Sequence, residues 1–65
     1  MKVTYDQETD SMTITFREAR IRESDELRPG MIVDFGYDGG PVRIEILQAS
    51  QVVENAREIQ FAVGH

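Results

Sequence analysis

The chain has no cysteine, and its only histidine is the terminal residue, His65. Without cysteine, disulfides and thiolate zinc sites are excluded, although these often support a domain as small as 65 residues. A chain of this length buries only ~60% of the surface that its unfolded form exposes. We therefore expect a free energy of unfolding of about 3–5 kcal/mol. A homodimer that shares a sheet edge would add buried surface.

Catalytic signatures are also missing. The serines Ser11, Ser24 and Ser50 have no histidine nearby in sequence to activate them. The glycines form neither a G-x-G-x-x-G nor a Walker pattern. We expect neither an enzyme nor a cofactor, and a small hydrolase that uses two carboxylates is the third alternative among the functions considered below.

Long hydrophobic runs are absent. No apolar stretch approaches the ~20 residues of a membrane span, and "MKVTYDQETD" lacks the apolar core of a signal peptide. We expect a cytoplasmic protein of one domain, residues 1–65, that does not contact a membrane.

Negative charge predominates, with twelve acidic against seven basic residues and a net charge of −5. This balance argues against nucleic acid and favours a basic protein partner. The basic residues are most concentrated at Arg17, Arg20, Arg22 and Arg28, which alternate with Glu18, Glu23, Asp25 and Glu26. This segment is either a solvated sheet edge or a docking strip to which a partner's strand adds.

Two hairpins follow from residues that alternate between apolar and polar. Residues 2–6 and 12–17 have strand period around a turn at "DQETD", and residues 31–37 and 41–47 flank "DGG", where Asp38-Gly39 makes the turn. Pro41 belongs at the first position of its strand. Residues 18–28 read as a strand edge or a turn.

After Leu47 the apolar period changes to that of a helix. Ala49, Val52, Val53 and Ala56 share one helical face, which predicts two to three turns, and residues 59–63 alternate as a last strand. The fold class is therefore α+β, a small antiparallel sheet of four to five strands with one helix near the C-terminus packed on one face.

The stretch "DFGYDGGPVRIE", Asp34 to Glu45, resembles an EF-hand loop, with Gly39 at the sixth position. Its flanks have strand period, so we interpret it as a hairpin and expect no metal there. Asp34 faces away from Val33 and Phe35, and we predict that it pairs with Arg43 across the hairpin as a surface contact of about 0–1 kcal/mol.

Asp6, Glu8 and Asp10 are the other candidate site residues. They lie within five positions and could converge on a cation, but short side chains that bond turn amides explain Asp6 and Asp10 equally well. A divalent-metal-binding domain that uses these carboxylates or Asp34 is the alternative to a protein-binding module.

The segments "VTYDQETDSMTITF" and "RPGMIVDFGYDGGPVRIEILQAS" resemble DUF2283, a family of small prokaryotic YuzE-like proteins, over about residues 2–50. The matching positions are Tyr5, Asp6, Glu8, Asp10, Met12, Ile14, Pro29, Gly30, Asp34, Gly39 or Gly40, Ile44 through Leu47, Ala49 and Ser50. Leucine is commoner in the family at Met12, and an acidic residue is commoner at Gly36. The resemblance implies a small antiparallel sheet with a helix near the C-terminus. It brings no established activity, but it implies an antitoxin-like role as one form of protein binding.

Overall fold

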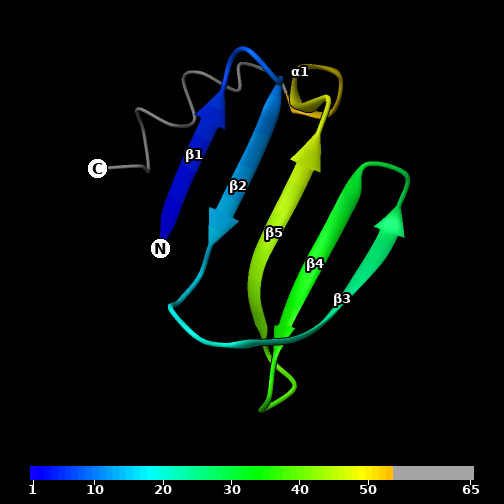
Figure 1. Ribbon diagram of the computed structural model, residues 1–65. Coiled ribbons are helices and arrows are strands. Elements are labelled where there is room, and N and C mark those ends of the chain that lie inside the picture. The colour runs from blue at the N-terminus through cyan, green and yellow to red at the C-terminus, as the bar shows by residue number, and fades with distance from the viewer. Residues whose placement is uncertain (54–65) are drawn as a thin grey trace.

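The computed structural model describes residues 1–53, which form one antiparallel sheet of five strands in the order β1-β2-β5-β4-β3 (Figure 1). The elements are β1 Lys2–Asp6, β2 Ser11–Thr15, β3 Ile21–Arg28, β4 Met31–Gly36, β5 Pro41–Leu47 and α1 Ala49–Val52. The fold class predicted from the sequence, a small α+β domain with an antiparallel sheet, is confirmed.

β5 is the central strand. It pairs with β2 on one side and with β4 on the other, so it joins the first hairpin to the second half of the sheet. The chain reaches this order because residues 16–20 carry it from β2 past β5 and β4 to the far edge, where β3 begins (Figure 1). β3 then forms a hairpin with β4, and β4 forms the next hairpin with β5.

The hydrophobic core lies on one face of the sheet, as the alternating residues predict. Register places Tyr5 opposite Met12 and Met12 opposite Ile46, so these side chains share that face. Met12 is only 1% exposed, and the start of α1 closes this end of the core with the fully buried Ala49.

The predicted helix is present but shorter than the expected two to three turns. α1 ends at Val52, and Val53 is already extended at φ −114° and ψ 124°. Two adjacent β-branched residues disfavour further helical turns. Residues 54–56 and the strand predicted at 59–63 lie outside the described residues. Among residues 1–53, no helix has the length and apolar character to span a membrane.

The β4–β5 hairpin replaces the apparent calcium loop, as predicted, but its turn is shifted by one residue. The amide of Gly39 donates to the carbonyl of Gly36 at 3.1 Å, so Tyr37 and Asp38 are the central residues. Gly39 follows with φ 84°, a conformation that glycine adopts without strain. Pro41 begins β5, where the prediction placed it.

Replacement of Met12 by alanine tests the core. The loss of a fully buried side chain should lower the free energy of unfolding by about 2–5 kcal/mol, which is comparable to the expected stability of the whole domain. Chemical denaturation followed by circular dichroism measures the change. Leu27→Ala is the control, because Leu27 is 57% exposed and its loss should stay within about 0.5 kcal/mol. Equal effects of the two variants would contradict this core.

Candidate functional site

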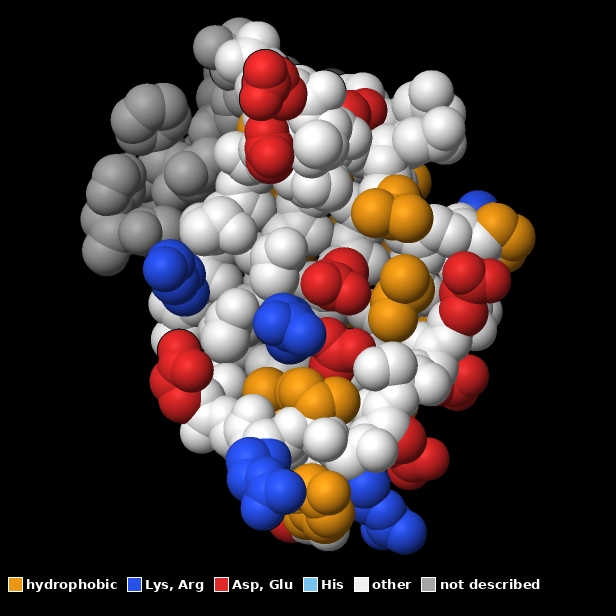
Figure 2. Space-filling view, in the orientation of Figure 1, with side chains coloured by type: hydrophobic (Ala, Val, Ile, Leu, Met, Phe, Trp, Pro, Cys, Tyr) orange, Lys and Arg blue, Asp and Glu red, His pale blue; other side chains and the backbone are white. Residues whose placement is uncertain are grey.

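A row of polar side chains crosses the sheet on the face opposite the core. Strand register aligns the row in the order Lys2, Thr15, Arg43, Asp34 and Ser24. Figure 2 shows basic and acidic side chains in contact near the middle of one face of the molecule. The row brings together Asp34 and Arg43, the two candidates predicted to pair.

Asp34 is the buried charge of this row, with a side chain only 4% exposed. Its Oδ2 accepts a hydrogen bond of 2.7 Å from Nε of Arg43, and its Oδ1 accepts one of 2.5 Å from the Ser24 hydroxyl. The predicted pairing with Arg43 is confirmed, but the prediction of a surface contact is wrong. The side chains of the two neighbouring strands cover the carboxylate from both sides, which strand alternation alone does not reveal.

The environment of Asp34 favours its ionised form. Burial acts to raise the pKa of Asp34, but the hydrogen bonds from Ser24 and Arg43 and the positive charge of Arg43 outweigh it, so the pKa is lowered. The hydrogen bond to Asp34 and the negative charge of that carboxylate raise the pKa of Arg43. Glu45 adds a more distant partner, with Oε1 4.0 Å from Nε of Arg43. Asp34 and Arg43 therefore both stay charged near neutral pH, and neither acts as a proton donor or acceptor there.

Asp10 forms a second cluster at the end of the sheet, beside the start of α1. Its Oδ1 accepts hydrogen bonds from the Tyr5 hydroxyl at 2.7 Å and the Ser50 amide at 3.0 Å, and its Oδ2 accepts one from the Ser50 hydroxyl at 2.6 Å. Its carbonyl accepts a further bond from the Ala49 amide at 2.8 Å. Asp10 therefore caps the start of α1, where Ser50 lies forty residues later in the chain.

Gln48, the N-cap residue of α1, forms no capping hydrogen bond with its side chain. Asp10 itself lies in the left-handed region at φ 52°, which aspartate tolerates better than most residues. The hydrogen bonds from Ser50 and Tyr5 lower the pKa of Asp10. The Asp10 carboxylate thus caps α1, a role that its interpretation as a turn residue did not include.

Asp6 and Glu8 do not converge with Asp10 on a cation. The Asp6 Oδ1 accepts the Glu8 amide at 3.0 Å, the local turn bond that the sequence predicted. Within residues 1–53, no three carboxylate or histidine side chains come close enough together to hold a metal ion. Asp34 lies elsewhere on the sheet. Leu47 of β5 pairs with Ser11, next to Asp10, whereas Asp34 pairs with Arg43, four residues earlier in β5 and about 13 Å away at strand spacing.

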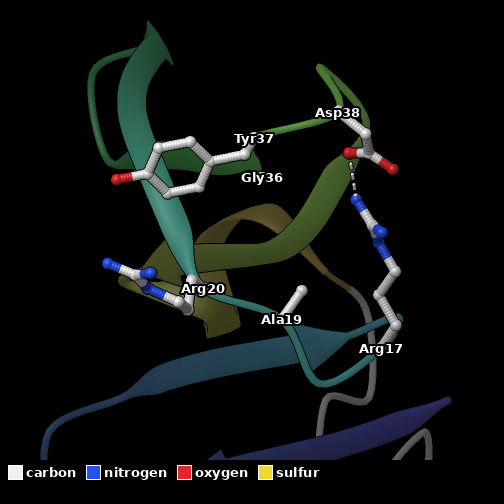
Figure 3. Close-up of a pocket in the computed structure, with 6 residues that line it drawn as sticks. All are labelled: Arg17, Ala19, Arg20, Gly36, Tyr37 and Asp38. Carbon is white, nitrogen blue, oxygen red and sulfur yellow. Dashed lines mark hydrogen bonds and ion pairs between the residues drawn. The ribbon is translucent and has the colours of Figure 1, made fainter.

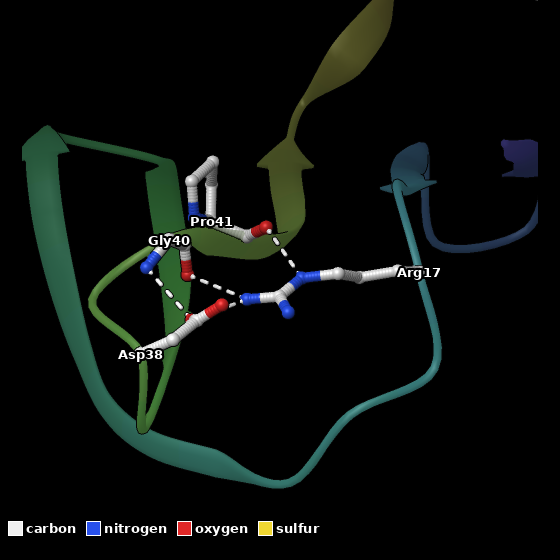
Figure 4. Close-up of polar contacts among 4 residues, drawn as sticks. All are labelled: Arg17, Asp38, Gly40 and Pro41. Atoms are coloured by element: carbon white, nitrogen blue, oxygen red, sulfur yellow. Dashed lines mark hydrogen bonds and ion pairs between the residues drawn. The ribbon is translucent and has the colours of Figure 1, made fainter.

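Arg17 fastens the β2–β3 connection to the β4–β5 turn (Figure 4). One guanidinium nitrogen donates to Asp38 at 2.6 Å and to the Gly40 carbonyl at 3.4 Å, and Nε donates to the Pro41 carbonyl at 3.5 Å. The arginine lies over Gly36, where an added Cβ would approach its Nη2 to 3.0 Å. The sequence contains no signal for this contact between residues 21 positions apart.

An open hollow of about 410 Å³ lies between this connection and the turn (Figure 3). Its lining consists of Arg17, Ala19, Arg20, Gly36, Tyr37 and Asp38. The Arg20 guanidinium carbon is 5.4 Å from the centre of the Tyr37 ring, a cation–π distance. Sequence reasoning did not single out Tyr37 or this hollow.

β3 forms one edge of the sheet, so of the two interpretations of residues 18–28, a strand edge or a turn, the strand edge is correct for residues 21–28. No ion pair joins the charged side chains of β3 to one another within the described residues. In that part of the chain, ion pairs join Arg17 to Asp38 and Arg43 to both Asp34 and Glu45. The acidic side chains of β3 therefore have no basic partner within residues 1–53.

The buried pair predicts a stability loss on Arg43→Gln. This change leaves the Asp34 carboxylate without its charged donor and should lower the free energy of unfolding by about 1.5–3 kcal/mol. The matched control is Asp34→Asn combined with Arg43→Gln, which removes both charges and should recover part of the loss. Denaturant unfolding at neutral pH measures both, and a double variant as unstable as the single one would contradict the pairing.

The Asp10 cluster predicts a pH dependence. The lowered pKa means that the ionised cap stabilises the fold above the ordinary value of about 3.9, and that this contribution is lost as pH falls through the lowered pKa. An NMR titration of the Asp10 carboxyl carbon should give a midpoint below the ordinary range. Ser50→Ala should raise that midpoint, because it removes the largest cause.

Thr9→Ala is the control for this titration. The Thr9 hydroxyl bonds to Ser11, whereas the Asp10 carboxylate bonds to Tyr5 and Ser50, so the loss of the Thr9 hydroxyl should leave the midpoint unchanged. An Asp10 midpoint at the ordinary value in the unmodified protein would refute the capping geometry.

Comparison with known proteins places the chain in a family. The sequence profile described as "Protein of unknown function (DUF2283)" matches residues 2–50. Searches of the curated proteins and of the solved structures give no match. Tyr5, Asp10, Ala49 and Ser50, which lie far apart in the matched segment, meet in one hydrogen-bonded cluster. The matched segment covers most of the 65 residues, and the chain therefore belongs to DUF2283, a family of unknown function.

Proposed function

We propose that this chain is a protein-binding module that accepts an extended strand of a basic partner along the outer edge of β3. The observation that carries the proposal is the position of this strand. β3 is eight residues long, and within residues 1–53 only its β4 side is paired. An unpaired edge presents backbone donors and acceptors to which another strand can add.

Charge supports a basic partner. Glu23, Asp25 and Glu26 are exposed and have no ion-pair partner among the described residues, and the chain as a whole carries a net charge of −5. Figure 2 shows acidic side chains spaced along the margin of the molecule where β3 lies. Opposite charge on a partner would speed encounter and fix the register of the added strand.

Binding without catalysis is part of this proposal. Asp10 and Asp34, the carboxylates with perturbed pKa values that the sequence singled out, are each bound by hydroxyl, amide or guanidinium donors that serve the fold. The same contacts make a metal site the less favoured alternative. An antitoxin-like role is one case of the proposal, and no contact in the structure favours it over other basic partners.

Charge reversal on the edge tests the proposal. The tagged protein should retain a partner from a native lysate of its source at low ionic strength, and the purified partner's affinity should then be measured. Glu23→Lys combined with Glu26→Lys should weaken binding about tenfold, because two attractive contacts become repulsive. Higher salt should weaken binding to the unmodified protein as well.

The matched control reverses two exposed acids away from β3. Glu8→Lys combined with Glu18→Lys changes the net charge by the same amount and lies in the two loops that flank β2. This control should lose only the part of the affinity that comes from the net charge of the protein. If both double variants lose the partner equally, or neither does, β3 is not the binding edge.

A further inference from the structure

The regular part of the free edge is short and acidic. Register between β3 and β4 shifts between Ile21 and Glu23 and again between Glu26 and Arg28, so an uninterrupted ladder runs from Glu23 to Glu26. Three of its four side chains are carboxylates. Glu23 and Asp25 lie on one face of the sheet, opposite Phe35 and Val33, and Glu26 lies on the other, opposite Ile32.

This pattern argues against a second copy of β3 as the added strand. Directly opposite residues of an antiparallel pair share a face, so two copies of β3 can align with Ser24 opposite Ser24, which places Glu23 against Asp25 twice, or with Asp25 opposite Asp25. Like charges directly opposite one another destabilise a strand pair. The edge is better matched by a foreign strand with basic side chains at these positions.

Positive charge also lies along this edge, at Arg22 and Arg28 within β3 and at Arg20 just before it, and of these three only Arg20 lines the hollow. Arg20 directly precedes Ile21, and its guanidinium stands over the Tyr37 ring in the hollow (Figure 3). The hollow also contains Arg17 and Asp38, but these two neutralise each other through their 2.6 Å ion pair. Arg20 has no carboxylate partner within residues 1–53, so the hollow carries one unmatched positive charge.

Direction follows from the sheet and the hollow together. Every strand pair in the sheet is antiparallel, and antiparallel pairing is slightly the more stable kind. An antiparallel strand on β3 begins beside Arg28 and ends beside Arg20. Its last residues therefore reach the hollow, where an acidic side chain meets the unmatched guanidinium.

We infer that the recognised segment lies antiparallel to β3, with basic side chains opposite Glu23, Asp25 and Glu26 and with an acidic side chain, nearer its C-terminus, beside Arg20 in the hollow. This inference rests on the proposed function and adds the direction and the charge pattern of the ligand. It predicts that a short peptide of this pattern binds without the rest of the partner.

The probe is the amidated peptide Cys-Val-Lys-Lys-Thr-Lys-Val-Val-Asp with a nitroxide label on its cysteine. In the inferred register the label lies beside Arg28 and the aspartate beside Arg20. NMR spectra of the protein should show amide broadening around Leu27 and Arg28 and little at Arg20. Broadening concentrated at Arg20 would reverse the direction and overturn the inference.

The hollow is tested with the same peptide unlabelled. Arg20→Ala should weaken binding about fivefold, the value of one well-placed exposed ion pair, while Arg28→Ala should change it less than about twofold. A peptide that ends in asparagine should bind equally to the Arg20→Ala variant and the unmodified protein. The hollow would be excluded as the binding site of the aspartate if the two arginine variants lost affinity equally. It would also be excluded if Arg20→Ala weakened binding of the asparagine peptide as much as that of the aspartate peptide.

The two proposals can fail separately. If the peptide leaves the β3 amides unmoved while a lysate partner still distinguishes the two charge-reversal variants, the edge binds a partner but this charge pattern and direction are wrong. If the charge-reversal variants behave alike as well, the proposed function fails with it.

Discussion

Backbone pairing of β5 on both sides is the constraint on which the rest of the structure depends. The β1–β2 hairpin and the β3–β4 hairpin contact each other through this strand, because β2 and β4 pair with its opposite edges. The arrangement requires the chain to cross from one side of the sheet to the other after β2. Arg17 holds that crossing against the β4–β5 turn, and the crossing in turn delivers β3 to the outer edge.

One face of the sheet forms the hydrophobic core, and the other holds a buried ion pair. The core face buries Met12, Ile46 and Ala49, which matter because a domain of this size buries little surface. The opposite face keeps a carboxylate, Asp34, almost fully covered and holds it with donors from both neighbouring strands. This pair specifies the alignment of β3, β4 and β5, since a slip of one residue would leave a buried charge without partners.

Much of the fold could be predicted because its signals are local. Alternation identified β1, β2, β4 and β5, and "DGG" identified the second hairpin. β3 was ambiguous because charged residues occupy both of its faces, as an edge strand permits. The strand order could not be predicted, because no pattern in residues 16–20 indicates at which edge of the sheet β3 will lie.

The candidate site was predictable only in part, for the same physical reason. The Asp34–Arg43 pair follows from hairpin register, but its burial depends on Ser24 in another strand. Asp10 was recognised as a turn residue, whereas its contact with Ser50 joins positions that the turn itself never brings together. The hollow beside Arg20 and Tyr37 depends on the crossing connection, which no local pattern encodes.

The capping of α1 by Asp10 has a consequence for the order of folding. A helix of four residues is not stable alone in water, and the acceptor for its first two amides is Asp10, forty residues before Ser50 in the chain. The β1–β2 loop must therefore already stand beside the end of β5 before the helix has a cap. The loss of loop entropy comes first and the helix-capping bonds come last, so this turn of helix reports on completed assembly of the sheet.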